Sequence, residues 1–306
     1  MKTILIAGGS GLIGSALSTE LTALGYEVII LSRRTGPGKI TWDPSAGNID
    51  IDRPLQVEAI VNLAGSNLSD GRWTKKRKKD ILSSRLQSAE TLKSYLQQGL
   101  LQTNVYIGAS GIGYYRDSGD QEVNENTPTA FPNDWMVQTV MQWEAGHQSI
   151  RSLHIRTVIV RFGIVLSTVG GALKEILKYV RFGIVASFGS GKQFWSWIHI
   201  RDAVRIVIYA IEHEDVEGVV LAVAPTPVPN KSLAKAINRQ MSIPRLIIPV
   251  PRFQLRLMLG EMHSVVFDSC KAIPRRMMEK HFNFLFPGVE SAMKDLLKKK
   301  KEEGNS

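Results

Sequence analysis

The amino-terminal stretch constrains the fold more than any other part of the chain. A short apolar run, Ile4 to Ala7, is followed by glycines spaced G-x-x-G-x-x-G at Gly8, Gly11 and Gly14. Such a run suits a strand that is buried on both faces. The apolar residues after Gly14 recur with a helical period. The sequence therefore predicts a strand, a glycine turn and a helix in that order, which is how a dinucleotide-binding fold begins.

Each glycine has a physical role in such a turn. Gly8 lets the chain leave the strand sharply, Gly11 lets a pyrophosphate approach the backbone, and Gly14 lets helix and strand pack closely. The helix begins at Leu12 and Ile13, where unpaired N–H groups and a partial positive charge favour phosphate. The alternative is an ordinary glycine-rich turn. A second apolar run at 27–31 supplies the context that favours dinucleotide binding.

The end of this second run indicates which dinucleotide is bound. An NAD-binding unit usually places an acidic residue there, to hold the ribose 2′-hydroxyl. This chain has Ser32, Arg33 and Arg34 instead. Arginine binds phosphate through a planar, charge-assisted fork, which suits the 2′-phosphate of NADP(H). A solvated basic loop is the alternative, and we predict NADP(H) as the cofactor.

Apolar runs and helical patterns alternate along the rest of the chain. The predicted strands cover 40–42, 59–63, 104–107, 156–162 and 219–223, and the predicted helices include 76–97, 134–149 and 203–212. This alternation predicts an α/β protein with a Rossmann-type doubly wound parallel sheet. We expect 40–42 to be an edge strand, and Asp202 to cap the helix 203–212.

The proline-rich segment after residue 224 predicts a smaller mixed α/β substrate lobe. The predicted NADP-binding Rossmann core covers 1–162 and 199–224. The smaller carboxyl-terminal substrate lobe covers 163–198 and 225–297, and a basic tail covers 298–306.

The formal charge of +10 and the pI near 9.7 raise the question of an anionic partner. Much of this charge lies in two runs, 75–79 and 298–301. No helix-turn-helix pattern, zinc spacing or aromatic–basic interleaving accompanies either run, so we interpret both as solvated faces and expect no nucleic-acid partner. The single Cys270 suits a reducing compartment, and no apolar run reaches membrane-spanning length. We expect a cytoplasmic protein without a membrane partner or a bound metal.

Many short motifs together resemble those of the extended short-chain dehydrogenases/reductases, the group that contains nucleotide-sugar epimerases. More specifically, the chain resembles the atypical branch labelled "epimerase family protein". Some relatives in this branch were compared with a cell-division inhibitor. It covers nearly the whole chain. Besides the glycine turn, the matching motifs lie at 62–65, 72–74, 84–85, 113–115, 143–144, 161, 163–166, 170–171, 189–191, 197–200 and 273–276.

The resemblance implies roles for further residues. In such proteins Ser32 and Arg33 hold the 2′-phosphate, and an arginine on the long helix reaches toward the cofactor's phosphates. For Arg85, a surface ion pair with Glu90 or Asp80 is the alternative. The other residues that the resemblance places at the cofactor are Leu63, Ala64, Gly65, Asp80 and Val165.

The resemblance also implies a catalytic set that is incomplete here. The group uses a serine or threonine with a tyrosine and a lysine four residues apart on one helix, where the ammonium lowers the phenol's pKa. Ser110 stands at the serine position, just past a predicted strand, but the tyrosine and lysine positions are Met136 and Val140. Tyr114, with Tyr115 beside it, and His199 are the candidate proton donors that remain. The alternatives are a packing aromatic for Tyr114 and a structural histidine for His199.

Three classes of function compete on this evidence. The first is an NADP-dependent oxidoreductase or epimerase with another proton donor, acting on a small-molecule substrate that the sequence does not identify. The second is a non-catalytic NADP(H)-binding sensor or scaffold, which the missing tyrosine–lysine pair favours. The third, nucleic-acid binding, rests on charge alone. A homodimer is one of the oligomeric states that the sequence leaves open.

Overall fold

The computed structural model describes residues 2–303, and the side chains of 2–298. Its contacts divide the chain into two compact units. The first unit contains the chain up to Gly111, Asn133–Arg161 and Val204–Val220; the second contains Ile112–Pro132, Phe162–Ala203 and the chain from Leu221 onward. The domain boundaries drawn from the sequence stay a prediction, and residues 304–306 of the predicted basic tail lie outside the described residues.

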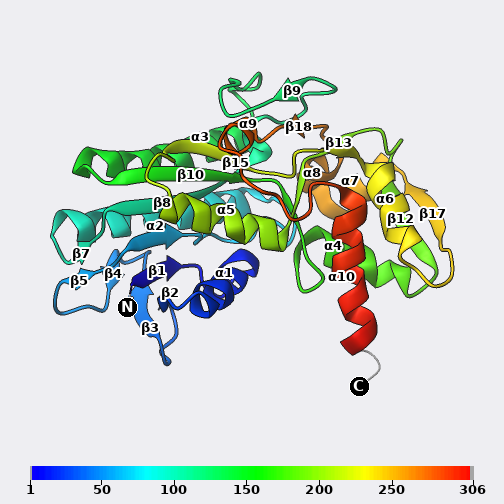
Figure 1. The fold of residues 1–306 in the computed structure, drawn as a ribbon. Helices are drawn as coiled ribbons and strands as arrows, with labels where there is room; N and C mark the ends of the chain where they lie inside the picture. Colours follow the sequence, from blue (N-terminus) through cyan, green and yellow to red (C-terminus); the bar gives the residue numbers. More distant parts are fainter. Residues whose placement is uncertain (1, 304–306) are drawn as a thin grey trace. The chain divides into compact units, whose positions relative to one another are not determined.

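The main sheet is eight-stranded and mostly parallel (Figure 1), which confirms the predicted fold class. β1 pairs in parallel with β2 and β6, β2 with β3, and β6 with β8, whereas β4 runs antiparallel to β3. In sheet order the strands are β15 (Gly218–Ala222), β10 (Arg156–Phe162), β8 (Val105–Gly111), β6 (Ala59–Asn62), β1 (Thr3–Ala7), β2 (Glu27–Ser32), β3 (Lys39–Asp43) and β4 (Asn48–Ile49). β5 (Leu55–Gln56) and β7 (Leu101–Gln102) form a small parallel pair.

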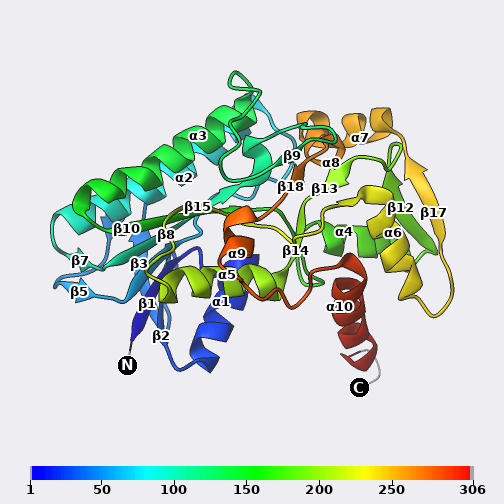
Figure 2. The same ribbon diagram turned by 45° about the horizontal axis from the view of Figure 1, so that its top comes forward.

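Helices cover both faces of this sheet. Figure 2 shows α2 (Lys75–Gln97) and α3 (Trp135–Gln148) on one face, and α1 (Leu12–Ala23) on the other. Thr74 caps α2 by accepting the N–H of Arg77, and Asp134 caps α3 by accepting two N–H groups. Both helices begin and end within a residue of their predicted bounds. The short helix η2 (Ser149–Leu153) follows α3.

The second unit is a set of small pairs and helices around its own core. β11 (Ile164–Leu166) pairs with β14 (Trp197–His199), β12 (Ile184–Phe188) with β17 (Leu246–Val250), β13 (Phe194–Trp195) with β16 (Val228–Pro229), and β9 (Glu122–Val123) with β18 (Lys271–Ala272). Its other elements are η1 (Ile112–Tyr114), α4 (Gly171–Val180), α6 (Asn230–Arg239), α7 (Arg252–Leu259), η3 (Gly260–His263), α8 (Ser264–Phe267), α9 (Arg275–Glu279) and α10 (Val289–Glu303). Trp195 and Trp197 are fully or nearly fully buried in this core.

Three local expectations are wrong. β8 runs through to Gly111, so Ser110 lies within the strand and not after it. β3 is covered by β4 and is not an edge. The helix α5 (Ile200–Glu212) begins before Asp202, so Asp202 lies in its first turn and is not the residue that precedes it. The Asp202 carboxylate accepts the N–H groups of Leu285 and Phe286 at 2.9 Å each.

No helix within the described part of the chain is both long enough and apolar enough to cross a membrane.

Candidate cofactor site

The strand order changes direction at β1, which has β2 on one side and β6 on the other. Open α/β sheets bind ligands at such a switch point, outside the carboxyl ends of the strands. Here the turn after β1 touches the loop after β6. Gly8 has a φ of +83°, and a Cβ added to it would lie 2.7 Å from the carbonyl carbon and oxygen of Leu63. The structure therefore brings the two predicted cofactor segments into contact.

The glycine turn leads directly into α1. The N–H of Gly11 donates to the carbonyl of Gly8 at 3.0 Å, and a Cβ on Gly14 would lie 2.8 Å from the Cα of Gly9. Gly11 caps α1 without a side chain, and the first turn holds no acidic residue. The first N–H groups of a helix, here those of Leu12 and Ile13, have no intrahelical partner. This arrangement suits a phosphate group.

Ser32 and the two arginines lie at the carboxyl end of β2, next to β1. The Ser32 Oγ accepts a hydrogen bond from the N–H of Arg34 at 3.0 Å, which folds the chain back at this point. Arg33 and Arg34 are exposed. Guanidinium groups at the same edge of the sheet as the glycine turn add positive charge where a 2′-phosphate would need it.

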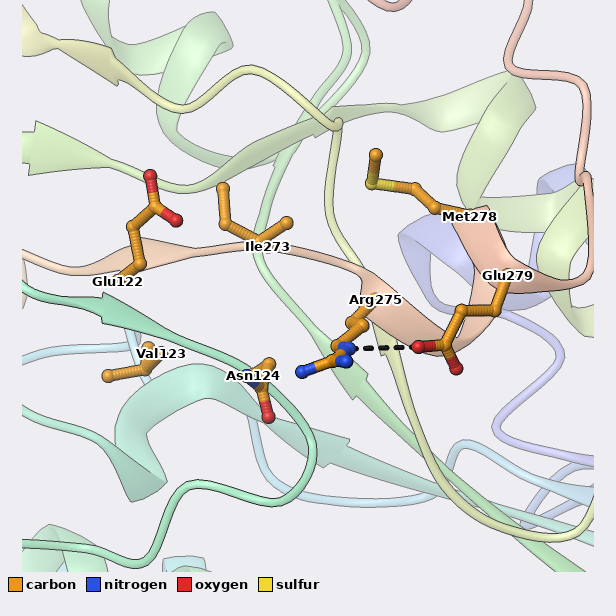
Figure 3. Close-up of a pocket in the computed structure, with 7 residues that line it drawn as sticks. All are labelled: Glu122, Val123, Asn124, Ile273, Arg275, Met278 and Glu279. Atoms are coloured by element: carbon orange, nitrogen blue, oxygen red, sulfur yellow. Dashed lines mark hydrogen bonds and ion pairs between the residues drawn. The ribbon is translucent and has the colours of Figure 1, made fainter.

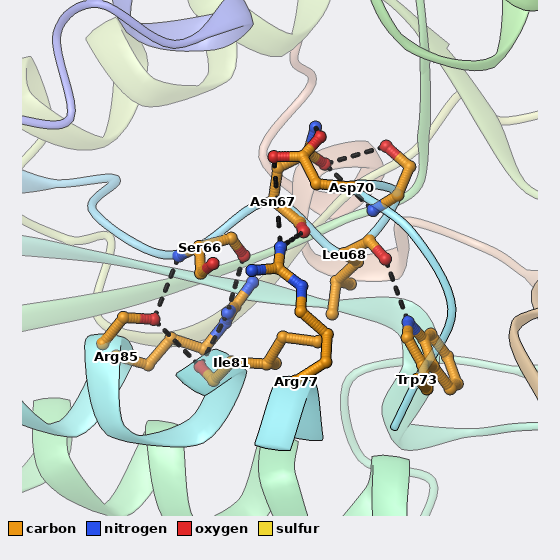
Figure 4. Close-up of polar contacts among 10 residues, drawn as sticks. Ser66, Asn67, Leu68, Asp70, Trp73, Arg77, Ile81 and Arg85 are labelled. Atoms are coloured by element: carbon orange, nitrogen blue, oxygen red, sulfur yellow. Dashed lines mark hydrogen bonds and ion pairs between the residues drawn. The ribbon is translucent and has the colours of Figure 1, made fainter. Parts of the chain in front are cut away.

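Arg85 lies beneath the loop that follows Gly65 (Figure 4). Its Nη1 donates to the carbonyls of Ser66 and Ile81 at 3.0 and 2.8 Å, and its guanidinium lies 4.6 Å from the ring centre of Trp143. Arg85 therefore binds these carbonyls and does not form the surface ion pair with Asp80 or Glu90 that was its alternative role. Burial, with a smaller contribution from Arg77, lowers the pKa of Arg85 to about 10, so the group remains charged at neutral pH.

Arg77, two turns earlier on α2, holds the same loop further along. It donates to the carbonyl of Asn67 and lies 3.9 Å from the Asp70 carboxylate (Figure 4). The Trp73 indole N–H donates to the Leu68 carbonyl at 2.9 Å. The predicted cofactor loop thus continues into a segment fixed by α2. No motif indicated these contacts, because two of them join a side chain to a main-chain carbonyl.

The structure gives the positions of two further residues that were predicted to contact the cofactor, Asp80 and Val165. Asp80 is half-buried on α2, and its main-chain carbonyl accepts the Ser83 hydroxyl at 3.4 Å. Val165 lies in the second unit, in register with Ile198 of β14. Both roles at the cofactor stay predictions.

A chain of buried hydrogen bonds joins the loop after β6 to β8. The N–H of Ala64 donates to the Asn62 side-chain oxygen at 3.1 Å, and the Asn62 amide donates to the Tyr106 hydroxyl at 3.0 Å. Tyr106 lies 2.8 Å from Nδ1 of His147, whose Nε2 lies 3.1 Å from the carbonyl of Ala109. Because a carbonyl only accepts, His147 carries its proton on Nε2 and accepts the Tyr106 hydroxyl at Nδ1.

Burial keeps both aromatic members of this chain neutral. It lowers the pKa of His147 to about 4 and raises the pKa of Tyr106. The direction of each hydrogen bond in the chain is therefore set. The network fixes the loop that carries Leu63 and Ala64. The sequence contains no local signal for the roles of Tyr106 and His147, because the two residues lie in separate elements.

Ser110 is engaged with a buried ion pair. Its Oγ donates to Oε1 of Glu144 at 2.6 Å, and Arg161 donates to both Glu144 oxygens at 2.7 and 2.8 Å. All three residues are at most 5% exposed. The bidentate arginine favours the ionised carboxylate. Because a serine hydroxyl has one proton, Ser110 in this arrangement can offer a ligand only its lone pairs.

Glu144 lies on the helix face where the sequence resemblance predicts the acid–base pair. Met136, Val140 and Glu144 follow at intervals of four on α3, so they share a face. Met136 and Val140 are 5% and 3% exposed. A carboxylate thus lies one turn beyond Val140, the predicted lysine position. The motif at 143–144 was recognised in the sequence, but the role of Glu144 was not.

Tyr114 and His199, the candidate donors, lie in the second unit. Tyr114 is half-buried and packs edge-to-face on Tyr115, with ring centres 5.2 Å apart. The His199 Nδ1 accepts the N–H of Arg201 at 3.1 Å, and its ring stacks on Phe286 at 3.9 Å. The Asp295 carboxylate is 3.3 Å from Nε2, but the two are not aligned for a hydrogen bond.

His199 is 1% exposed, and burial lowers its pKa to about 4, more than nearby carboxylates raise it. A buried, neutral and stacked imidazole fits a structural histidine better than it fits a proton shuttle. The role of Tyr114 stays a prediction.

An open pocket of about 430 Å³ also lies in the second unit (Figure 3). Arg275 donates to Glu279 at 2.8 Å within it. None of the predicted site residues lines this pocket, which is formed by Glu122, Val123, Asn124, Ile273, Arg275, Met278 and Glu279. Within the described residues, no group of three or more His, Cys, Asp or Glu side chains could hold a metal ion.

A mostly parallel sheet with a glycine turn at its switch point defines a Rossmann-type protein. More narrowly, the chain belongs to the NAD dependent epimerase/dehydratase family, which matches residues 4–224. Residues 250–296 match a domain of unknown function, DUF1731.

Proteins named as epimerase family proteins resemble the chain over its length. Epimerase family protein SDR39U1 of Mus musculus is 34% identical over 297 residues, covering 96% of this chain and 99% of that protein. YfhF of Bacillus subtilis is 32% identical over 304 residues, covering 97% and 99%. The crystal structure of human SDR39U1 (isoform 2) with NADPH superposes with a TM-score of 0.88 at 32% identity, covering 97% and 99%.

Proposed function

We propose that the chain binds NADP(H) and acts as an oxidoreductase, or as an epimerase-like enzyme that transfers hydride, without the usual tyrosine–lysine pair. The observation that carries the proposal is the contact of Gly8 with Leu63 at the switch point, beside Ser32 and Arg33. The NADPH in the human SDR39U1 structure supports the choice of cofactor.

Each segment has a distinct task in this proposal. The glycine turn and the start of α1 hold the pyrophosphate through main-chain N–H groups. Ser32 and Arg33 hold the 2′-phosphate, and Leu63, Ala64 and Gly65 line the groove for the adenosine half. The bound cofactor supplies or accepts the hydride. Arg85 acts from below, by fixing the loop that continues from Gly65.

The contacts of Ser110 favour one kind of ligand. Because its proton is donated to Glu144, Ser110 accepts a hydrogen bond from a ligand more readily than it polarises a carbonyl. A substrate hydroxyl, as in alcohol oxidation by NADP⁺, fits this better than a ketone.

A second function is favoured by a separate observation. Met136 and Val140 place two apolar side chains at the family's proton-transfer positions. A protein that holds NADP(H) and signals its binding, without turnover, needs no proton donor there. This sensor is the alternative to the enzyme.

Cofactor fluorescence separates these functions. NADPH should bind, with enhanced emission, to the wild type. NADP⁺-loaded protein is then offered a panel of sugar nucleotides and simple alcohols, and NADPH formation is followed. Slow turnover that drops about tenfold in Ser110→Ala, with unchanged NADPH affinity, supports the enzyme. NADPH binding without turnover across the panel supports the sensor, and no NADPH binding contradicts both.

A further inference from the structure

The second unit exposes large apolar side chains on two consecutive elements, β17 and α7, which follow one another in Figures 1 and 2. Leu246 is 72% exposed, Phe253 64% and Leu257 69%. Together with Phe182, Ile248 and Met258, which are also exposed, these residues form what we call the apolar ridge. Exposed apolar side chains that gather on neighbouring elements mark interaction sites.

The strand part of the ridge has apolar side chains on both faces. Ile247 packs against the core of the second unit, whereas its neighbours Leu246 and Ile248 are exposed. Alternation along a strand sends them to the opposite face. The N–H of Leu246 donates to the carbonyl of Gly183 at 3.0 Å, which places Phe182 beside the start of the strand.

The helix part has apolar residues on its solvent-exposed face as well as on its buried face. In α7 only Leu255 is buried. Phe253 and Leu257 are four residues apart, on one face that is exposed to solvent. A surface helix of a soluble protein normally turns its apolar stripe to the core. The outward stripe is therefore unexplained by the packing of this unit.

The charges around the ridge indicate what it contacts. The segments 179–183 and 243–258 contain four arginines and no acidic residue: Arg181, Arg245, Arg252 and Arg256. A second copy of the chain would place like charges opposite each other across the ridge. An anionic surface would complement them.

We propose that the apolar ridge docks on the surface of a bilayer that contains anionic lipid. Phe253 and Leu257 enter the interface between headgroups and acyl chains, and the flanking arginines contact the lipid phosphates. This is peripheral binding, for which a membrane-spanning helix is not needed. It goes beyond the proposed function and is independent of cofactor binding. It replaces the expectation of no membrane partner, which rested on the lengths of apolar runs.

Co-sedimentation with vesicles tests the proposal. The wild type should bind vesicles of phosphatidylcholine with phosphatidylglycerol, but not phosphatidylcholine alone, and added salt should weaken binding. Phe253→Ser with Leu257→Ser should weaken it about tenfold or more. Arg252→Gln with Arg256→Gln should weaken it by about fivefold for each charge.

Matched changes in the first unit serve as controls. Leu24 is 54% exposed, and Arg151 has an exposed side chain. Leu24→Ser and Arg151→Gln should leave vesicle binding unchanged, and every variant should keep its NADPH affinity. Equal binding to both kinds of vesicle, or none to the anionic ones, overturns the proposal. So does a wild-type dimer in light scattering that the Phe253 and Leu257 changes convert to a monomer.

Discussion

At the scale of single residues, Ser110 shows how partners decide a role. The sequence resemblance predicts that it is the serine of a catalytic set, but its hydroxyl donates to Glu144, which in turn accepts from Arg161. Removing one partner of a buried ion pair is costly because the other charge is left without compensation. The stability of the protein should therefore depend strongly on this pair.

Arg161→Leu should lower the free energy of unfolding by about 3–5 kcal/mol, since it leaves the Glu144 carboxylate buried and unpaired. Urea denaturation measures the loss. Adding Glu144→Leu should recover much of it, because the double variant has no buried charge at this position. A loss below about 1 kcal/mol in the single variant would show that Glu144 finds another partner or water.

The residues that could be predicted from the sequence form contiguous motifs. The glycine turn and the segment from Ser32 to Arg34 each contain enough local chemistry to indicate phosphate. The partners Glu144 and Arg161 could not be assigned to Ser110, because separate elements bring them together. The same holds for His147, whose ring packs where a Cβ on Gly108 would be, 2.6 Å from Cδ2.

At the scale of elements, small residues misled the prediction of β8. Its glycines and Ser110 are typical of a loop. Here they lie in a strand, where small side chains let α3 pack closely, with His147 over Gly108. The long helices α2 and α3 were predictable, since their apolar residues recur over several turns and each begins at a capping residue. The outward apolar stripe of α7 was not, because periodicity does not reveal which face is buried.

Installing the missing pair on α3 tests how far this helix has diverged. Met136→Tyr with Val140→Lys puts a phenol and an ammonium at positions that are 5% and 3% exposed. We expect a fall in stability of about 1–3 kcal/mol from overpacking alone, and more from the buried charge. Thermal unfolding measures this, with Met141→Lys at an exposed position of the same helix as control. Unchanged stability would mean that the site still has room for the pair.

At the scale of the whole molecule, buried histidines make stability depend on pH. The pKa values of His147 and His199 are each lowered to about 4. Below pH 6.5 the unfolded chain takes up protons that the folded chain cannot, so stability falls from there down to about pH 4. One such histidine accounts for about 3 kcal/mol over this range.

Urea denaturation across this pH range should therefore show a shallower loss for His147→Gln than for the wild type, even if that variant is less stable throughout. His154→Asn is a matched control, since His154 is exposed and in a left-handed conformation that asparagine tolerates. Identical pH slopes for the wild type and His147→Gln would contradict a neutral, buried His147.

We propose that the glycine turn and the Ser32–Arg33 segment together bind NADP(H). Calorimetric titration of NADPH and NADH into the wild type and Arg33→Ala tests it most directly. We predict that NADPH binds the wild type at least tenfold more tightly than NADH. Arg33→Ala should lose about 1.5–3 kcal/mol of NADPH binding, the range for a charged hydrogen bond, with little change for NADH. Equal affinity of the wild type for the two cofactors would contradict the account.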